Sequence, residues 1–385
     1  MMRQFAIAAP RIFDGAGWHT DAALLVEDGS VLDIVPRGSV PAGAPLIETD
    51  GILAPGFVDL QVNGGGGVML NDRQDVEAIR TICTAHARFG TTALLPTLIT
   101  DTPEITASAV AGGTAAAQAG VPGFAGLHLE GPHLSLARKG AHDPKLIRPM
   151  EDADRDFLVA ARQSLPALLT TIAPESVTAD RVTALSEAGV VVSIGHTDTS
   201  ARTARAYAQA GARMATHLFN AMSQIGSREP GVAGAVIDST TLWAGLIADG
   251  YHVDPVTMGI ALRAKRGPGR IFLVTDAMAP LGTDMPSFTL NGRTILRRDG
   301  RLTLEDGTLA GADLDMISAV RFIHRVIGLE LDEALRMAST YPAEAMGFST
   351  RGRLAKGSRA DIVALTPDLE VSRVWIGGET AFSAS

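Results

Sequence analysis

The chain has 385 residues, and its 42 acidic and 33 basic side chains give a formal net charge of −9. Because 46% of the residues are hydrophobic and only 19% are charged, the composition excludes a largely disordered protein. The acidic balance, without any basic block, argues against nucleic acid as a partner, although local charges can still bind a small anion.

Cysteine content and hydropathy indicate where in the cell the protein is located. Cys83 is the only cysteine, so the chain can form no internal disulfide and no thiolate metal cluster. No apolar run reaches the roughly 18 residues that a membrane helix needs, and the first ten residues lack a convincing cleavage site. These features predict a cytoplasmic protein that has no membrane partner.

The two ends of the chain resemble each other. Residues 1–54 contain short apolar stretches separated by turn signals such as Asp14-Gly15. The segment 350–385 contains the strand-like runs Ile362–Leu365 and Val371–Ile376. Two β-rich ends around a different middle predict one small β domain built from both termini.

The middle of the chain, residues 55–349, alternates between apolar runs and Ala-rich segments of helical periodicity. Eight runs are largely apolar along their length, as is typical of parallel strands covered on both faces. This pattern is typical of a (β/α)₈ TIM-like barrel, with a doubly wound open sheet as the alternative that periodicity alone does not exclude. The predicted strands are 57–62, 92–98, 126–129, 167–172, 190–194, 213–217, 242–248 and 271–275, and helices are predicted at 75–89, 103–119, 179–188, 200–210 and 255–265.

Polar residues that can bind a metal or move protons follow most of these strands, where barrel enzymes hold their active sites. Two imidazoles and one carboxylate suit Zn²⁺, and Glu130, His196 and His217 come from nearby strand ends. Such a metal would lower the pKa of a bound water toward about 7. Asp276, after the eighth strand, could take a proton from that water and pass it to a leaving amine. The pattern predicts a metal-assisted amide or ester hydrolase.

Other interpretations stay open at this point. Any single histidine at a strand end is more often structural than a ligand, and only the joint placement of the four residues favours a metal site. The same site could act on a cyclic amide or an N-acyl amino acid. A barrel without chemistry that serves as an assembly partner is disfavoured, because both the ligand set and Asp276 are present.

Several motifs carry a family resemblance. The segment 55–59, Pro-Gly-Phe-Val-Asp, resembles the first strand of the amidohydrolase superfamily, in which two histidines usually follow at alternate positions. Within that superfamily, the chain is similar to the N-acetylglucosamine-6-phosphate deacetylases. The motifs that carry this likeness lie at 127–133, 139–142, 216–222, 228–231, 248–252, 273–277 and 307–311.

The resemblance implies a deformed (β/α)₈ barrel of the amidohydrolase type with a small β-sandwich domain from both termini. It implies an enzyme of amino-sugar metabolism that hydrolyses N-acetyl-D-glucosamine 6-phosphate to D-glucosamine 6-phosphate and acetate. Metal-bound hydroxide would attack the acetamide carbonyl, with Asp276 as general base and then acid and His142 polarising the carbonyl. By the same likeness, Glu130, His196 and His217 would hold the metal.

The resemblance also implies how the phosphosugar is bound. Arg228 would reach the site of a neighbouring subunit, so a homodimer is expected. The residues implied in substrate binding are Ala141, His142, Asn220, Ala221, Arg228, His252, Leu309, Ala310 and Gly311.

Two departures from the superfamily pattern bear on the metal. Gln61 and Asn63 stand where the two strand-1 histidines are usual, and amides are poor replacements for imidazole. They are therefore interpreted as degenerate second-metal positions, and one divalent metal per subunit is predicted. Zinc is the expected ion, although a His₂Glu set also accepts iron, cobalt or manganese. The preference between the gluco and galacto epimers stays open.

Overall fold

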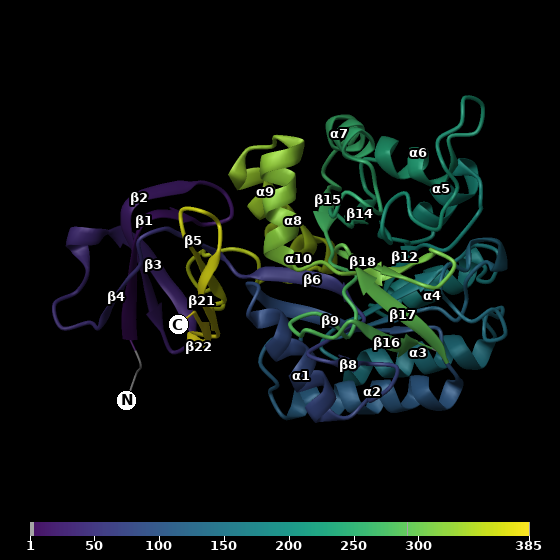
Figure 1. Ribbon diagram of the computed structural model, residues 1–385, viewed down its shortest axis with the longest axis horizontal. Helices are drawn as coiled ribbons and strands as arrows, with labels where there is room; N and C mark the ends of the chain where they lie inside the picture. The colour runs from purple at the N-terminus through teal and green to yellow at the C-terminus, as the bar shows by residue number, and fades with distance from the viewer. Residues whose placement is uncertain (1–3, 291, 385) are drawn as a thin grey trace.

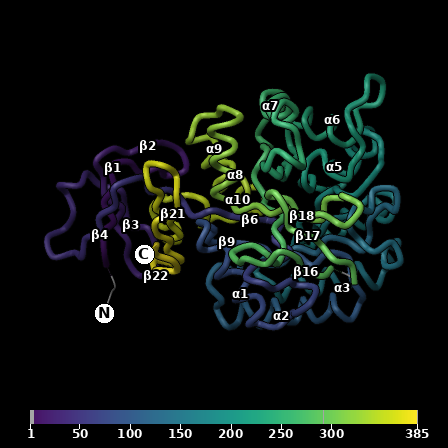
Figure 2. The backbone as a smooth tube through the Cα atoms, in the orientation of Figure 1, coloured from purple at the N-terminus to yellow at the C-terminus, as the bar shows by residue number. Residues whose placement is uncertain are grey.

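The computed structural model describes residues 4–290 and 292–384. Both ends of the described chain lie in one eight-stranded sheet at one end of the molecule (Figure 1), and the tube view shows the same arrangement (Figure 2). Its strand order is β22-β21-β20-β5-β1-β2-β3, and β4 also pairs with β1. The strands are β1 (Gln4–Phe13), β2 (Trp18–Glu27), β3 (Ser30–Pro36), β4 (Leu46–Glu48), β5 (Ile52–Pro55), β20 (Ile362–Leu365), β21 (Val371–Ile376) and β22 (Glu379–Ser383).

This terminal sheet has its own apolar core, which includes Ile7, Leu24, Leu53, Ile362 and Trp375. Strand β20 pairs antiparallel with β5, so the sheet joins segments about 310 residues apart in the chain. The expected β domain from both termini is therefore present. The boundaries at residues 54 and 350 stay a prediction.

A second sheet of eight strands forms the barrel. All of its pairings are parallel, in the order β15-β14-β13-β12-β11-β10-β9-β6. Its two edges approach each other through the parallel bridge between Val62 and Ala277. This closure confirms the barrel over the open sheet. The strands are β6 (Phe57–Val62), β9 (Thr91–Ile99), β10 (Leu127–Glu130), β11 (Leu168–Ile172), β12 (Val191–Ile194), β13 (Met214–Ala215), β14 (Trp243–Leu246) and β15 (Ile271–Leu273).

All eight predicted barrel strands are present, but the last three end earlier than expected. The backbone leaves the extended region at His217 and Asp276, where φ is 27° and 51°. These residues therefore lie in loops just beyond β13 and β15. The apolar pattern continues past the point at which strand pairing stops, which is why the sequence overestimates these strands.

Helices surround the barrel (Figure 1). The five predicted helices are present as α1 (Val76–Ala87), α2 (Pro103–Gln118), α4 (Ala179–Glu187), α5 (Ala201–Gln209) and α7 (Pro255–Ala264). Asp75, Thr102, Ser200 and Asp254 accept a backbone N–H at the start of α1, α2, α5 and α7, as N-caps do. The structure adds helices α3 (Asp152–Ser164), α6 (Gly231–Asp238), α8 (Met316–Phe322), α9 (Leu331–Ala338) and α10 (Thr340–Met346). Among the described helices, none is long and apolar enough to cross a membrane.

A small antiparallel sheet, inserted between β15 and α8, was not predicted. It consists of β16 (Ser287–Leu290), β17 (Arg293–Arg298), β18 (Arg301–Thr303) and β19 (Leu309–Ala312), in sequence order. Asp299 and Gly300 connect β17 to β18 with positive φ values, the conformation that a tight hairpin needs. A short two-stranded hairpin, β7 (Gly64–Gly65) and β8 (Val68–Met69), follows β6.

Candidate active site

A cavity opens at the carboxyl ends of the barrel strands. It brings together residues from the ends of seven barrel strands and from the inserted sheet, as a barrel active site does. The described residues that line it are Asn63, Ile99, Glu130, Gly140, Ala141, His142, His196, His217, Asn220, Ala221, Ile247, His252, Asp276, Met278, Leu290, Leu309 and Gly311.

The three expected metal ligands converge on one point. Glu130 Oε1 lies 3.2 Å from His196 Nε2 and 3.2 Å from His217 Nε2. The two imidazole nitrogens are 3.1 Å apart. Ligand atoms about 2.0–2.2 Å from a tetrahedral Zn²⁺ lie roughly 3.3–3.6 Å from one another, so this triangle is close to the size that an ion needs.

The protonation of His196 indicates that a cation belongs in this triangle. His196 Nδ1 lies 2.8 Å from the carbonyl oxygen of Arg138, which can only accept, so Nδ1 carries a proton. In the neutral ring, Nε2 then presents a lone pair toward the Glu130 carboxylate. Two lone pairs in a buried site repel each other unless a positive charge lies between them. The donor set therefore fits a bound metal ion.

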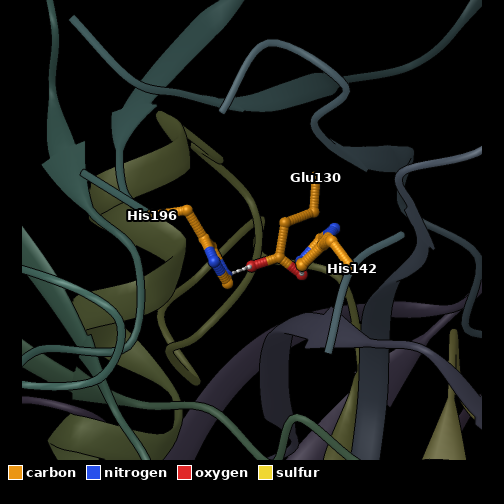
Figure 3. Close-up of side chains that lie close together, drawn as sticks. All are labelled: Glu130, His142 and His196. Atoms are coloured by element: carbon orange, nitrogen blue, oxygen red, sulfur yellow. Dashed lines mark ion pairs between the residues drawn. The ribbon is translucent and has the colours of Figure 1, made fainter. Parts of the chain in front are cut away.

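His142 approaches the same carboxylate from the other side, as Figure 3 shows. Its Nε2 lies 3.9 Å from Glu130 Oε2, and Glu130, His142 and His196 also form a group whose ligand atoms could hold a metal. His142 Nδ1 accepts the backbone N–H of Thr100 at 3.3 Å and lies 2.8 Å from the Thr100 hydroxyl. This contact assigns the ring proton to Nε2, so His142 can donate a hydrogen bond into the cavity.

The charges in the site depend on one another. Burial alone would raise the pKa of Glu130, but its contacts with His196 and His217 outweigh burial and hold the pKa well below the usual value. Burial, reinforced by the adjacent His196 ring, lowers the pKa of His142 to about 3, so the His142 ring is neutral at pH 7. Burial and the nearby Glu130 raise the pKa of Asp276 to about 6. A carboxyl with a pKa near neutrality suits proton transfer in both directions.

Two amide side chains, one in β6 and one directly after it, each donate a hydrogen bond to a carboxylate of the site. Gln61 Nε2 donates to Glu130 Oε1 at 3.1 Å, and Asn63 Nδ2 donates to Asp276 Oδ1 at 2.7 Å. At both positions an amide N–H faces the carboxylate where an imidazole lone pair would face a metal. The structure thus gives these residues a hydrogen-bonding function that their interpretation as degenerate ligands did not include.

The expected substrate residues divide into two sets. Ala141, Asn220, Ala221, His252, Leu309 and Gly311 line the cavity. His252 is held by Asp249, whose Oδ2 lies 2.6 Å from His252 Nδ1. Ala310 is buried in the apolar cluster behind the cavity and does not line it. Arg228 lies on an exposed loop and is not among the described residues that line the cavity of its own chain.

Several lining residues were not identified from the sequence. Ile99 and Leu290 carry no reactive group and follow ordinary apolar patterns, so no local signal separates them from the core. Thr100, which orients His142 across 42 positions of sequence, is likewise found only through its contact. Met278 does have a signal in the sequence, because it follows the predicted proton-transfer residue Asp276 by only two positions.

Comparisons with known proteins were consistent with this geometry. Residues 52–381 match the model of the amidohydrolase family. The chain is 43% identical to the N-acetylgalactosamine-6-phosphate deacetylase of Shewanella sp. (strain ANA-3), over 87% of this chain and 84% of that protein. It is 35% identical to the N-acetylglucosamine-6-phosphate deacetylase of Haemophilus influenzae, over 93% and 94%. The crystal structure of N-acetylglucosamine-6-phosphate deacetylase from Pasteurella multocida superimposes with a TM-score of 0.93 at 34% identity, over 98% and 99% of the two chains.

Proposed function

The chain belongs to the amidohydrolase family, and from this membership and the cavity we propose that it removes the acetyl group from N-acetyl-D-glucosamine 6-phosphate. The products are D-glucosamine 6-phosphate and acetate, as expected for an enzyme of amino-sugar metabolism. The observation that carries the proposal is the convergence of Glu130, His196 and His217 beside Asp276 in one cavity. The named activities of the Haemophilus and Pasteurella relatives support it.

In this proposal, Glu130, His196 and His217 hold one divalent metal, with zinc as the expected ion and iron, cobalt or manganese as alternatives. The bound metal supplies Lewis acidity, which polarises a carbonyl and lowers the pKa of water. We choose His217 over His142 as the third ligand because its Nε2 is 3.2 Å from Glu130, against 3.9 Å for His142.

The remaining chemistry belongs to side chains of this chain. Asp276 accepts a proton as water adds to the acetamide carbonyl carbon. His142 donates its Nε2 proton in a hydrogen bond to the carbonyl oxygen, on which negative charge develops. Asp276 then protonates the sugar nitrogen, the carbon–nitrogen bond breaks, and the amine leaves together with acetic acid, which loses its remaining proton to solvent at neutral pH and becomes acetate. The proton that Asp276 takes from water therefore ends on the nitrogen of the amine product.

Gln61 and Asn63 support a site with a single metal. Their amide N–H groups already donate to Glu130 and Asp276, which uses the carboxylate lone pairs that a second ion would need. Metal analysis of the purified, active protein should give a value near one ion per chain. A value near two in active protein would contradict the single-metal proposal.

We propose that the lining residues outside the metal triangle of Glu130, His196 and His217 bind the phosphosugar. Asn220, Ala221 and His252 bind the 6-phosphate, and Ala141, Leu309 and Gly311 line the sugar. Arg228 completes the phosphate site from the neighbouring subunit of a homodimer. In support, Arg228 is exposed and lies outside the cavity of its own chain, and the exposed apolar residues Ile225, Tyr251, Val256 and Ile260 lie on its loop and around α7.

The test compares substrates. Purified, zinc-loaded protein is mixed with N-acetylglucosamine 6-phosphate or with unphosphorylated N-acetylglucosamine, and acetate release is measured. Turnover of the phosphorylated sugar alone is the expected result. Failure to release acetate from either sugar would overturn the proposal, and N-acyl amino acids and cyclic amides would then be tested.

A second substrate is favoured by one specific observation. The Shewanella relative, at 43% identity, is named as an N-acetylgalactosamine-6-phosphate deacetylase. The galacto epimer belongs in the same assay, and the ratio of the two kcat/KM values decides between the epimers. A cytoplasmic location is also part of the proposal, since the single cysteine of the chain, Cys83, is buried and free.

A further inference from the structure

One wall of the cavity is apolar and closed. Ile99, Met278 and Leu290 line the cavity and belong to one apolar cluster, which also contains Met69 and Phe288. The three lining side chains are only 5%, 2% and 2% exposed. They come from the end of β9, the segment after β15 and the end of β16, so the barrel and the inserted sheet build this wall together.

The apolar wall adjoins the two residues that flank the reacting carbonyl. Met278 follows Asp276 by two positions in the chain. Ile99 directly precedes Thr100, whose backbone N–H and hydroxyl hold His142. The wall therefore begins next to the proton-transfer residue on one side and next to the carbonyl-binding residue on the other.

The position of Met278 is sterically defined. A Cβ atom added at Gly311 would lie 2.5 Å from Met278 Cγ and 2.6 Å from its Sδ, so the Met278 side chain packs directly on the Gly311 backbone. Gly311 also has a φ of +67°, a conformation that L side chains rarely adopt. A flexible methionine is thus held in place by a glycine that lines the same cavity.

The chemistry of the substrate indicates what this wall contacts. A phosphosugar carries hydroxyl and phosphate groups around its ring, and the alkyl part of the acyl group is its one purely apolar portion. The acyl methyl is a single bond away from the carbonyl carbon, which must lie between Asp276 and His142. Burial of that methyl against apolar side chains is favourable, whereas burial of sugar hydroxyls there would leave them without hydrogen bonds.

Resting on the proposed function, we propose that Ile99, Met278 and Leu290 form the acyl subsite and limit the acyl group that the enzyme removes to the size of acetyl. A longer chain meets the buried cluster behind the wall. One additional methylene in such a pocket changes kcat/KM by about 10- to 200-fold. The wild-type enzyme should therefore prefer N-acetyl over N-propionyl and N-butyryl substrates by a factor in this range.

The experiment measures kcat/KM for the N-formyl, N-acetyl, N-propionyl and N-butyryl derivatives of glucosamine 6-phosphate, by release of the free amine. In Met278→Ala, the removed side-chain atoms leave room beside the carbonyl, so the propionyl-to-acetyl ratio should rise at least about tenfold. Leu290→Ala tests the same subsite from the inserted sheet, in case the first variant is unstable.

A matched control is available in the same cluster. Met285 packs against the cluster but is not one of the described residues lining the cavity. Met285→Ala should leave the ratio unchanged, and thermal melting of each variant reports any loss of folding.

The outcomes separate the two proposals. No activity of the wild-type enzyme on the N-acetyl sugar would overturn the proposed function itself. Wild-type activity with an unchanged propionyl-to-acetyl ratio in folded Met278→Ala and Leu290→Ala would overturn the acyl subsite alone. An equal change of KM for every acyl length would show that the wall contacts the sugar, which also contradicts the inference.

Discussion

Three of the polar residues in the cavity have an unusual backbone. His196, His217 and Asp276 have φ values of 47°, 27° and 51°, in the region that favours glycine. A non-glycine residue there costs about 1–2 kcal/mol, and such strain is often found where a side chain must be aimed at a site. All three follow barrel strands and line the cavity. The chain thus gives up some stability to turn these side chains into the barrel mouth.

At this same scale, Asp276 should be required for proton transfer. Asp276→Asn keeps the size of the side chain and the oxygen that accepts from Asn63, but it cannot take a proton. We expect kcat to fall by about 10²- to 10⁴-fold, while metal content and substrate affinity stay close to wild type. Steady-state kinetics together with metal analysis check this. Turnover near the wild-type rate would remove Asp276 from the mechanism.

Asn63 should act as a positioning residue for Asp276. Removing its amide in Asn63→Ala takes away the 2.7 Å hydrogen bond to the carboxylate, a type of bond worth about 1.5–3 kcal/mol. We expect kcat to fall by about 10- to 100-fold, and the acidic limb of the kcat/KM profile should move to higher pH, because the ionised carboxylate loses a donor.

A control with similar chemistry lies nearby. Asn71 is also buried and donates to the carboxylate of Asp101 at 2.8 Å, but it does not line the cavity. Asn71→Ala should affect stability without moving the pH profile. Equal kinetic effects of the two variants would show that Asn63 acts only through folding.

At the scale of the elements, one buried carboxylate adds a side-chain contact to the backbone bridge that closes the barrel. Asp59 on β6 accepts from the Thr275 hydroxyl and, at 3.2 Å, from the Thr275 backbone N–H just beyond β15. Asp59 is fully buried, and Asp276 is the next residue after its partner. The closure contact therefore also determines how the loop that carries Asp276 leaves the barrel.

This closure makes stability depend on pH. Burial raises the pKa of Asp59 to about 7 in the folded protein, well above its usual value, so the folded state holds a proton that the unfolded state releases. Stability from this group is present at low pH and declines as the pH rises through the window between the two pKa values, by about 1.4 kcal/mol per pH unit.

The test is urea unfolding of the wild type and of Asp59→Asn at several pH values from about 4.5 to 8. The asparagine variant does not titrate, so its stability should lack this contribution. The difference between the two proteins should therefore change in favour of the variant as the pH rises. Parallel stability curves across this range would be inconsistent with a buried, titrating Asp59.

The inserted sheet contributes at the element scale as well. Arg293 on β17 donates to the carbonyl oxygen of Ala141, in the loop that carries His142. Arg297 pairs with Asp313 just after β19 at 2.7 Å. Leu290, Leu309 and Gly311 of the same sheet line the cavity. The four strands β16 to β19 thus form one side of the active site and support the loop opposite.

At the scale of the whole molecule, the proposed dimer can be tested by mixing variants. Arg228→Ala should raise KM by about 10- to 100-fold through loss of a charged phosphate contact. If Arg228 completes the neighbouring site, a hybrid of one Arg228→Ala subunit and one Asp276→Asn subunit contains one intact site. Coexpression of the two variants should then restore about a quarter of the wild-type activity at low substrate concentration.

Two results would contradict this arrangement. Activity of the mixture no greater than the average of the two separate variants would show that Arg228 acts within its own chain or not at all. A monomeric mass in solution at the assay concentration would exclude a shared site directly.

The order of residues along the chain predicted the eight strands and the β domain of both termini, and it left the choice between a closed barrel and an open sheet to the structure. Largely apolar runs such as 57–62 and 168–172 are typical of parallel strands covered on both faces, and the structure buries both runs completely in such strands, so local pattern and global fold agree. Because all parallel strands of a barrel end at the same rim, Glu130, His196, His217 and Asp276 could be brought together from their positions alone. The motifs around them identified the family.

Only the tertiary structure decided how these residues are held. Gln61 and Glu130 are 69 positions apart, and Asn63 and Asp276 are 213 apart, so no local pattern reveals that the amides donate to the carboxylates. The inserted sheet packs its apolar face on the barrel rim, which places Leu290 beside Met278 and Ile99. Apolar side chains carry no chemical signature, and their role depends on what lies across the cavity. Contacts between segments distant in sequence are set by packing, and packing exists only once the chain has folded.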